Sequence, residues 1–413
     1  MLRNLFSNYS EVLIIKILHW DEMFHPSFGY QINVLPKFQV RQGHEVVIVT
    51  SEDIKNHPTF LGFGNKENIE LEDKLYSKKY GIKIIRLPIH RVVSGRVIYK
   101  KGYLERIKAL KPDVIMCHTN DTLSAIRIAQ KHKSLNIPVV FDNHMLEMAS
   151  RNPLSGLFRL YFRLFVTPII KENKWVVIRT QDDNYVNRRL GIPENQTPFI
   201  SFGSDTTLFH PDRNVRNDFR KKHDLKQSDF VIVYTGKLDE AKGGMLLAQA
   251  FEEKFKMAKN IVLVVVGNTK GEYGRKVDEM FAKCKNRVLR FPTQKYVDLA
   301  KFYQAADLLV FPKQCSLSFY DAQACGLPVI SEDNNINIAR LQHENGFNFK
   351  ADDIDDFRNK IISSIEMDEL DFKQVGKNAY EFVNSNYNYK DIAQQYTDIL
   401  IKEVKKFKER QHQ

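Results

Sequence analysis

The sequence predicts an α/β protein built from two doubly wound domains that face each other across a cleft. Three observations predict this fold. The chain has 413 residues, which is more than a single hydrophobic core usually organises. Short apolar runs alternate with helical stretches, as expected for parallel strands that are buried on both faces. The alternation begins near residue 12 and begins again near residue 230, so we expect one sheet in each half.

The first half opens with a strand–helix–strand unit. Residues 12–18 are mostly apolar, residues 31–42 carry a helical pattern that Gly43 ends, and residues 46–49 form the next apolar run. Because helical stretches separate the later runs as well, we expect parallel strands of one sheet. These later runs lie at residues 114–117, 139–141 and 176–178.

The second half repeats the pattern after a polar, charge-rich stretch at residues 211–229, which we interpret as a linker. Its expected strands lie at residues 230–234, 261–266, 288–291, 308–311 and 329–330. The last segment, from residue 389 to about residue 409, has apolar residues at helical spacing and predicts an amphipathic helix. We therefore expect two Rossmann-like domains and a C-terminal helix that packs back on the first domain, at residues 1–213, 214–385 and 386–413.

Composition is that of a folded protein. Hydrophobic residues make up 43% and charged residues 27% of the chain, which is ordinary for a globular domain. No apolar run approaches the length of a transmembrane helix, and the N-terminus lacks the pattern of a signal peptide. The cysteines show no spacing that would indicate a disulfide framework or a zinc site. We therefore expect a cytoplasmic protein with no bound metal.

The protein is basic, with a formal net charge of +12. A positive charge of this size favours polyanions, namely nucleic acids, acidic membrane surfaces or phosphate-bearing substrates. The basic residues are spread along the chain, and no RNA-binding signature or zinc-finger spacing is present. We therefore expect no nucleic-acid partner, and charge alone does not choose between the other two.

Two lysines lie in the first loop of the second half, in the segment VYTGKLDEAKGG. Gly236 and Lys237 follow the predicted strand, and Lys242 and Gly243 lead into a helix. A glycine-containing turn of this kind lets backbone N–H groups approach a phosphate, and two lysines can neutralise a diphosphate. Lysines beside a turn are also common surface residues, so both interpretations stand.

A second loop of the same half, in FPKQCSLSFYDAQACGLPVI, carries hydroxyl groups and a carboxylate. Ser316 and Ser318 follow a predicted strand, and Asp321 lies in the first turn of the next helix, which Gly326 ends. Asp321 is therefore placed to accept hydrogen bonds from a ribose, while the loop faces phosphate. The alternative is that Asp321 only complements the helix dipole.

The motifs of both halves resemble those of the family 4 retaining glycosyltransferases of the GT-B fold. The segments VYTGKLDEAKGG, AADLLVFP and DAQACGLPVI are similar in order and spacing to the donor-side motifs of this family. Upstream, RQGHEVVIVTS, KPDVIMCHT and FISFGSDTTLFHPD resemble its second strand, its histidine-bearing strand and its interdomain linker. The resemblance covers nearly the whole chain. It implies that residues 1–213 face the acceptor and that residues 214–385 bind a nucleotide sugar.

The resemblance assigns roles to C-terminal residues one position at a time. Lys237 stands where the family has a diphosphate-binding arginine, Lys242 coincides with its basic partner, and Gly236 lies beside them. Asp321 takes the place of the second glutamate of a paired-glutamate motif, which is expected to bind the ribose. The first glutamate has no counterpart, because the loop before Asp321 is contracted. The residues of that loop expected to contact the donor are Ser316, Leu317 and Ser318.

Two N-terminal residues are implied to line the site. Gly29, in HPSFGYQ, is the one glycine retained from the glycine-rich loop that follows the first strand of the family. His144, in PVVFDNHMLEM, matches a histidine that lines the donor sugar. The alternatives are that Gly29 is a plain turn residue and that His144 is structural. His118, at the end of the preceding strand, is a weaker candidate.

The implied reaction transfers a sugar from a nucleoside diphosphate sugar, expected to be a UDP-sugar, with retention of configuration. The acceptor is expected to be a hydroxyl of a glycan or of a lipid-linked molecule in bacterial surface polysaccharide or glycoconjugate synthesis. Lys237 and Lys242 would stabilise the leaving diphosphate, so neither a metal nor a cofactor is expected. Two other functions fit the same fold: a non-catalytic scaffold or subunit, which the missing glutamate favours, and a nucleotide-sugar epimerase.

One segment, residues 154–170, predicts a contact away from the cleft. Its sequence LSGLFRLYFRLFVTPII mixes large apolar residues with Arg159 and Arg163, as a helix at an anionic membrane surface would. The basic net charge favours the same interpretation, which places the protein peripherally on the inner face of the cell membrane. The alternative is an ordinary buried helix before the strand at residue 176.

Overall fold

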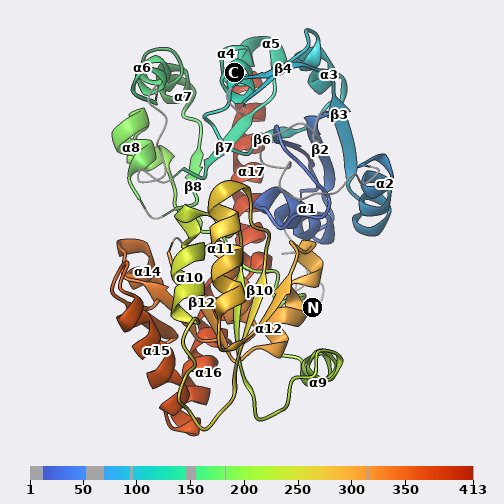
Figure 1. Ribbon diagram of the computed structural model, residues 1–413. Helices are drawn as coiled ribbons and strands as arrows, with labels where there is room; N and C mark the ends of the chain where they lie inside the picture. Colours follow the sequence, from blue (N-terminus) through green and yellow to red (C-terminus); the bar gives the residue numbers. More distant parts are fainter. Residues whose placement is uncertain are drawn as a thin grey trace, which may run out of the picture.

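The computed structural model describes residues 13–52, 69–93, 96–145, 155–181, 183–313 and 316–412. It contains two six-stranded parallel sheets, one in each half of the chain, with helices packed around them (Figure 1). The prediction of two doubly wound α/β domains is therefore confirmed.

The N-terminal sheet has the strand order β3-β2-β1-β6-β7-β8. Its neighbouring strands are all parallel. The central strands are buried along their whole length because helices cover both faces of the sheet. The strands are β1 (Lys16–Trp20), β2 (Glu45–Ser51), β3 (Lys83–Leu87), β6 (Val114–Cys117), β7 (Val139–Asn143) and β8 (Val177–Arg179).

The helices of the N-terminal half connect these strands. Thr122 shows how one of them begins, because its side chain accepts a hydrogen bond from the backbone N–H of Ala125 and caps the helix. An antiparallel pair, β4 (Ile89–Val93) and β5 (Arg96–Tyr99), lies outside the main sheet. The helices are α1 (Gln31–Arg41), α2 (Ile69–Tyr80), α3 (Tyr103–Ala109), α4 (Leu123–Gln130), α5 (His132–Leu135), α6 (Ser155–Phe165), α7 (Thr167–Asn173) and α8 (Tyr185–Leu190), with a short 3-10 turn η2 (Glu194–Gln196).

The C-terminal sheet repeats the order of the first, as β11-β10-β9-β12-β13-β14. In both sheets the first strand in sequence is third in line, and the fourth strand of the sheet crosses to its other side. This crossing creates a topological switch point, where doubly wound proteins bind their ligands. The strands are β9 (Phe230–Thr235), β10 (Ile261–Val266), β11 (Arg287–Phe291), β12 (Leu308–Phe311), β13 (Val329–Glu332) and β14 (Gly346–Phe349).

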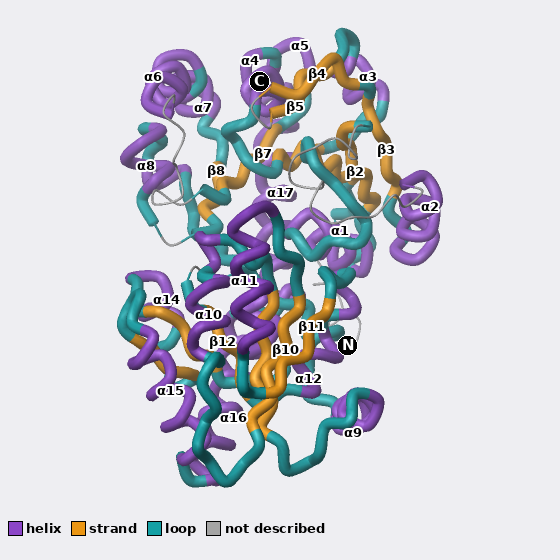
Figure 2. Tube along the Cα trace, in the orientation of Figure 1, coloured by secondary structure: helices purple, strands orange, loops and turns teal. Residues whose placement is uncertain are grey.

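Helices and short 3-10 turns follow the strands of the C-terminal sheet. Figure 2 shows the strands of this half as a group enclosed by helices. The helical segments are η3 (Glu240–Lys242), α10 (Gly244–Ala250), α11 (Gly271–Lys283), η4 (Tyr296–Asp298), α12 (Ala300–Ala305), α13 (Ser318–Ala324), α14 (Asn335–Arg340), α15 (Ile354–Glu366) and α16 (Glu369–Asn386).

The linker predicted at residues 211–229 is mostly a helix, α9 (Arg213–Lys222), so that prediction was wrong. Asp212 caps the helix by accepting hydrogen bonds from two backbone N–H groups of its first turn. Arg220 is fully buried, and its guanidinium lies 2.7 Å from the carboxylate of Asp307. A polar sequence is a poor guide here because two of its arginines, Arg216 and Arg220, pair with Asp307 of the C-terminal domain.

The last helix, α17 (Tyr389–Gln411), runs from the C-terminal domain along the N-terminal domain (Figure 1). It packs against α1, where the side chain of Thr397 donates a 2.8 Å hydrogen bond to Gln42. The α17 side chains of Tyr396 and Leu400 are fully buried. Neither α17 nor any other described helix combines the length and the apolar composition that crossing a membrane needs.

Candidate functional site

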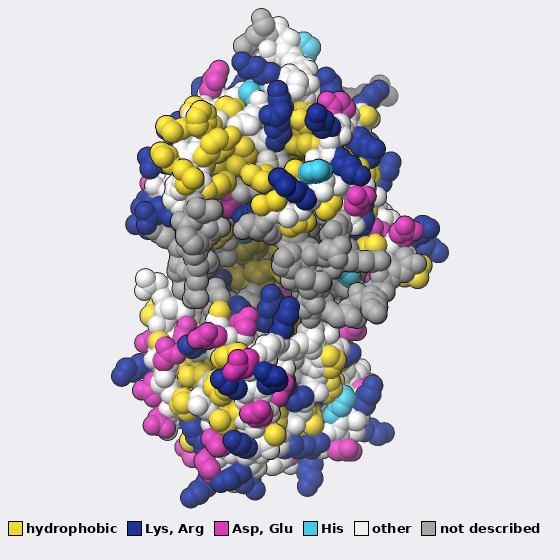
Figure 3. Space-filling view, turned by 45° about the horizontal axis from the view of Figure 1, so that its top comes forward, with side chains coloured by type: hydrophobic (Ala, Val, Ile, Leu, Met, Phe, Trp, Pro, Cys, Tyr) yellow, Lys and Arg dark blue, Asp and Glu magenta, His cyan; other side chains and the backbone are white. Residues whose placement is uncertain are grey.

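Loops that follow strands of the two sheets meet between the domains. The carbonyl of Ser27, after β1, accepts a 2.9 Å hydrogen bond from the backbone N–H of Tyr296, after β11. The hydroxyl of Ser204, between the two sheets in sequence, donates to Asp321, after β12. The carboxyl ends of both sheets therefore face each other. Figure 3 shows the molecule hollowed between its two halves.

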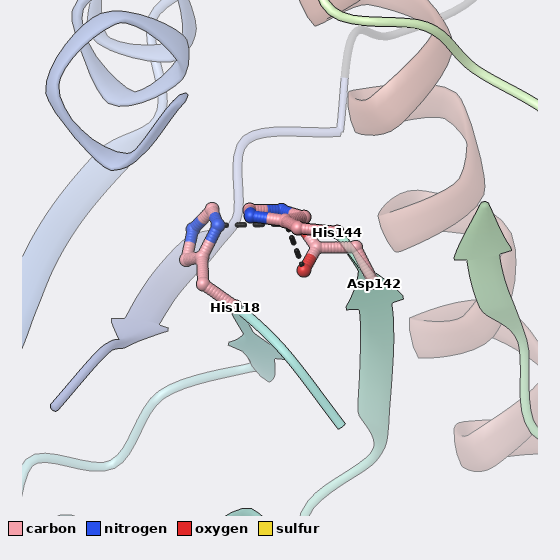
Figure 4. A group of neighbouring side chains, drawn as sticks. All are labelled: His118, Asp142 and His144. Atoms are coloured by element: carbon pink, nitrogen blue, oxygen red, sulfur yellow. Dashed lines mark ion pairs between the residues drawn. The ribbon is translucent and has the colours of Figure 1, made fainter. Parts of the chain in front are cut away.

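A chain of polar side chains lies at the carboxyl end of the N-terminal sheet. His19 is in β1, His118 directly follows β6, and Asp142 is in β7, with His144 just beyond it. His19 Nδ1 lies 2.8 Å from His118 Nε2. The carboxylate of Asp142 lies 3.2 Å from His118 Nδ1 and 3.1 Å from His144 Nε2 (Figure 4). The predicted residue His144 is therefore the outer, part-exposed end of a chain that begins deep in the sheet.

Two buried glutamines of α1 contact the two ends of this chain of side chains. Gln39 Oε1 lies 2.6 Å from His19 Nε2, and Gln31 Oε1 lies 2.8 Å from His144 Nε2. An amide oxygen only accepts hydrogen bonds, so the imidazole nitrogen that faces it carries a proton. The Gln31 contact thus fixes the ring of His144 with a protonated Nε2.

Burial and charge together set the protonation of the chain. Burial, and after it the neighbouring His118, lower the pKa of His19 to about 3. Burial alone would raise the pKa of Asp142, but the attraction of His144 and His118 outweighs it and lowers the value. Burial alone would lower the pKa of His144, but the charge of Asp142 outweighs it and raises the value. An ionised Asp142 therefore favours the protonated form of His144.

The residues of Figure 4 also have the chemistry of metal ligands. His118, Asp142 and His144 each offer one ligand atom, and these atoms lie within 4.8 Å of one another. Imidazole and carboxylate groups suit zinc and similar ions. The carboxylate, however, already pairs with both imidazoles, and those pairings use the atoms that a metal would take. We therefore interpret the group as a network that orients His144.

The loop after β9 carries the two predicted lysines. Gly236 has a φ of +148°, which favours glycine, and the chain then turns into η3. Asp239 caps this turn, because its side chain accepts a 3.0 Å hydrogen bond from the backbone N–H of Lys242. Lys237 is exposed and Lys242 is partly buried. The backbone geometry thus fixes the shape of the loop, and the side chain of Lys237 is exposed to solvent.

The loop after β12 packs directly against this lysine loop. A Cβ at Gly243 would lie 2.9 Å from Cγ of Lys313 and 3.0 Å from Cβ of Pro312, and the φ of Gly243 is +72°. Only glycine therefore fits there without strain. Lys313 forms a 2.7 Å ion pair with Asp352, and this hydrogen bond raises the pKa of Lys313. The contact brings a third cation next to the predicted lysines.

The contracted loop continues through the other predicted donor residues. Ser316, Leu317 and Ser318 are each half-buried. The hydroxyl of Ser316 accepts a 3.3 Å hydrogen bond from the backbone N–H of Ser318, at the start of α13. The structure thus places these residues beside Lys313, in the same wall as the lysine loop. Their contact with a donor stays a prediction.

Asp321 is buried beneath this loop, with only 3% of its surface exposed. Its Oδ1 accepts a 2.7 Å hydrogen bond from Ser204 and a 3.2 Å hydrogen bond from the hydroxyl of Tyr296. Burial raises the pKa of Asp321 to about 8, although both hydrogen bonds oppose the rise. The observed partners of Asp321 are therefore protein groups that join the two domains, and its contact with a ribose stays a prediction.

Gly29 allows a close approach of the two domains. A Cβ at this position would overlap the ring of Tyr296. The ring therefore lies flat against backbone that has no side chain, one residue from Phe28 and two from the hydrogen-bonded Ser27. Gly29 is thus a point of contact between domains, and its predicted contact with the donor stays a prediction.

Several residues of the site were not predicted from the sequence. His19 and Asp142 did carry a signal, because each interrupts an apolar run that the fold buries, and a buried ionisable group needs a partner. Gln31 and Tyr296 carried none, because their roles come from contacts between segments far apart in the sequence.

Two family models match the chain, one on each domain. Residues 35–208 match the model described as Glycosyltransferase Family 4. Residues 215–382 match the model described as Glycosyl transferases group 1. The chain belongs to glycosyltransferase family 4. The two matches meet in the connection between the sheets, so each family model corresponds to one Rossmann-like domain.

Curated relatives of this glycosyltransferase are distant. A probable sucrose-phosphate synthase of Thermosipho melanesiensis is 24% identical over 92% of both chains. A lipopolysaccharide 1,2-N-acetylglucosaminetransferase of Salmonella typhimurium is 26% identical over 45% of this chain and 52% of its own length. The latter match therefore spans about half of that relative.

Solved structures share the fold over nearly the whole chain. A glycosyltransferase from Rickettsia africae superposes with a TM-score of 0.73 at 17% identity, over 95% of this chain and 99% of that one. HepE from Anabaena, solved in complex with UDP and glucose, gives a TM-score of 0.69 at 17% identity, over 94% of this chain and 100% of that one. The glycosyltransferase described here therefore has the GT-B fold, in which two Rossmann-like domains face each other.

Proposed function

We propose that the protein is a retaining, metal-independent glycosyltransferase that acts in the cytoplasm on a nucleoside diphosphate sugar, specifically a UDP-sugar. The acceptor is a hydroxyl of a glycan or of a lipid-linked molecule, in bacterial surface polysaccharide or glycoconjugate synthesis. No cofactor takes part. The observation that carries the proposal is the meeting of two chemistries between the domains. Cationic loops end the C-terminal sheet, and a histidine–carboxylate chain ends the N-terminal sheet.

The cationic loops suit the leaving group. Breaking the bond between the sugar and the diphosphate leaves negative charge on the phosphate oxygens, and fixed positive charge stabilises it as it develops. Lys237 and Lys242 stand in family-matched positions, and Lys313 packs on the same loop. Lysine offers point charges rather than the two-pronged contact of arginine, so several lysines compensate for a missing arginine fork.

His144 suits the sugar side of the same bond. The contacts with Asp142 and Gln31 hold its ring, and the attraction of Asp142 raises the pKa of His144 and so favours the protonated ring. A histidine held in this way can donate a hydrogen bond to a sugar hydroxyl and orient the anomeric carbon. His144 therefore acts as an orienting residue for the donor sugar.

No protein group is required as a base in this mechanism. Asp142 is paired with two imidazoles, and Asp321 is buried with its pKa raised to about 8 by that burial. The leaving phosphate lies on the face of the sugar where the acceptor arrives in a retaining reaction. We propose that it accepts the proton of the acceptor hydroxyl as the new bond forms.

The test begins with a thermal-shift panel of UDP-, GDP- and ADP-sugars, because a ligand that binds only the folded state raises the melting temperature. The donor that gives the largest shift is then incubated with excess chelator, and the products are identified by NMR. We expect release of the nucleoside diphosphate and a product with the donor's anomeric configuration. Loss of turnover with chelator, or an inverted product, would contradict the mechanism.

The same experiment separates the two other functions. A non-catalytic scaffold would bind a nucleotide sugar without releasing a nucleoside diphosphate, in the presence of any acceptor. A nucleotide-sugar epimerase would convert the donor into a second nucleotide sugar. Either result would replace glycosyl transfer as the function of the site.

A further inference from the structure

Helix α6 (Ser155–Phe165) exposes an unusual amount of apolar surface. Its side chains of Leu157, Leu160, Leu164 and Phe165 are 69%, 54%, 58% and 55% exposed, and Tyr161 is 42% exposed. Within the helix, Phe162 is the one buried residue. Hydrophobic side chains gather on the upper part of the molecule at the left of Figure 3, the side on which Figure 1 places α6. The alternative of an ordinary buried helix therefore does not describe α6.

The spacing of these residues defines one exposed stripe. Leu157, Leu160 and Leu164 are separated by three and four residues, so they lie on the same side of the helix. Phe158 and Phe162 lie on the other side and pack into the core of the N-terminal domain. One side of the helix thus packs into the core of the domain. The other side, with Leu157, Leu160 and Leu164, is a second apolar surface, which we call the α6 face.

Basic residues are frequent in the segment of the chain that carries the α6 face. The segment from residue 155 to residue 191, which holds α6, α7 and α8, contains seven lysines and arginines against three acidic residues. Arg163 on α6 and Lys171 and Lys174 in and after α7 are exposed. Helix α6 itself contains no acidic residue. An apolar stripe within a basic surround is the pattern of helices that lie in the interface of an anionic bilayer.

We propose that the α6 face docks the protein on an anionic lipid bilayer, with the leucine stripe in the interface and the lysines and arginines at the lipid phosphates. Charge complementarity favours this partner over a second copy of the chain. A two-fold contact through the α6 face would place identical basic surfaces against each other. A bilayer of anionic lipids instead attracts each of these charges.

The docking would set where the proposed reaction happens. It would hold the N-terminal domain, which carries His144, at the surface where lipid-linked acceptors reside. This consequence rests on the proposed function, but the docking itself does not. Lipid binding is measured without a donor or an acceptor, so failure of one proposal is distinguishable from failure of the other.

The test is co-sedimentation of the purified full-length protein with vesicles of phosphatidylcholine, with and without phosphatidylglycerol. We expect binding to the anionic vesicles that weakens as salt is raised. L157Q/L164Q replaces two exposed leucines of the stripe, and L370Q replaces a leucine of α16 that is 75% exposed and serves as the matched control. We expect a loss of about tenfold or more in the partition constant for L157Q/L164Q and no loss for L370Q.

A second pair of variants tests the charges. K171Q/K174N removes two exposed lysines beside the α6 face, and K221Q/K222Q removes two exposed lysines of α9 in the other domain. We expect K171Q/K174N, but not K221Q/K222Q, to weaken binding to the anionic vesicles. The same variant should also reduce the dependence of that binding on salt. Circular dichroism melts of every variant confirm that the protein is folded.

Three results would overturn the proposal. The wild type could stay in the supernatant with anionic vesicles at low salt. L157Q/L164Q could bind the vesicles as tightly as L370Q does. Sedimentation velocity could show a wild-type dimer that L157Q/L164Q converts to a monomer while neither protein binds vesicles, which would assign the α6 face to a second copy of the chain.

Discussion

The two sheets share one strand order but end in opposite chemistry. At the N-terminal sheet, His19, His118 and Asp142 are fully buried and pair with one another. At the C-terminal sheet, Lys237 is exposed, and its loop is shaped by glycines that approach other backbone closely. One end therefore holds its polar groups in place by mutual contacts, and the other holds positive charge in water.

The difference indicates a different role for each sheet in the proposed reaction. A network whose members already contact one another before a ligand arrives provides fixed geometry, which is what orienting a sugar requires. An exposed cation such as that of Lys237 is accessible to an anion that arrives from solvent, which is what binding a diphosphate requires. The same fold thus supports orientation at one sheet and charge stabilisation at the other. Each prediction below removes one element of this division.

The largest effect is expected from Lys242→Ala. Loss of a cation that stabilises the leaving diphosphate should lower the rate of transfer by about 10²–10³-fold. The measurement is the initial rate of nucleoside diphosphate release at saturating donor and acceptor. Lys254→Ala removes an exposed lysine elsewhere in the same domain and should leave the rate unchanged. A rate for Lys242→Ala close to that of Lys254→Ala would remove Lys242 from the mechanism.

A smaller loss is expected from Asp142→Asn, which leaves the shape of the N-terminal network but removes its negative charge. The pKa of His144 should fall, because the charge of Asp142 is what raises it against burial. Transfer should slow by about 10–100-fold, because His144 would orient the donor sugar less precisely. An NMR titration of the His144 ring measures the pKa directly. Asp113→Asn, at the other end of the sheet, is the control, and an unshifted His144 pKa would contradict the assignment.

Gly29→Ala tests whether the contact between the loop after β1 and Tyr296 holds the carboxyl ends of the two sheets together. The added Cβ would overlap the Tyr296 ring, so the free energy of unfolding should fall by about 1–3 kcal/mol. Gly156→Ala is the matched control, because a Cβ at Gly156 meets open space in α6. Urea unfolding of the two variants makes the comparison. Equal stability would show that the loop moves away at little cost.

The smallest effect is expected from Asp321→Asn and appears only as a dependence on pH. Burial raises the pKa of Asp321 to about 8, above the value near 3.9 of an unfolded chain. Its favourable contribution is therefore complete below the unfolded pKa and is lost as pH rises through about 8. The wild type should lose about 1 kcal/mol more than the variant between pH 7 and pH 8. Parallel slopes in urea unfolding would show that Asp321 does not stay protonated in the folded protein.

Much of the fold could be predicted because buried parallel strands look alike in any sequence. The strands at 114–117 and 261–266 were placed correctly, since their apolar runs end at turns on both sides. β3 and β14 were missed because they are edge strands, and edge strands are only partly buried and less apolar. The helix α9 was missed because Arg216 and Arg220 attach it to the C-terminal domain through tertiary contacts with Asp307.

The site was predictable only in part. Lys237, Lys242 and His144 could be named because each follows a strand end and matches a motif of the family. The pairing of Asp321 with Tyr296 could not be named, because it depends on how two separate segments of the C-terminal domain pack against each other. The network behind His144 likewise depends on a strand order that brings β1, β6 and β7 side by side.

The most direct test of the division between the sheets is the affinity of the free nucleoside diphosphate, which carries the charge but not the sugar. Titration calorimetry compares the wild type, Lys242→Ala and His144→Gln with the diphosphate of the preferred donor. We predict that Lys242→Ala weakens binding by about tenfold or more, as loss of a charged contact does, and that His144→Gln leaves it unchanged. Equal weakening by both variants, or by neither, would contradict the account.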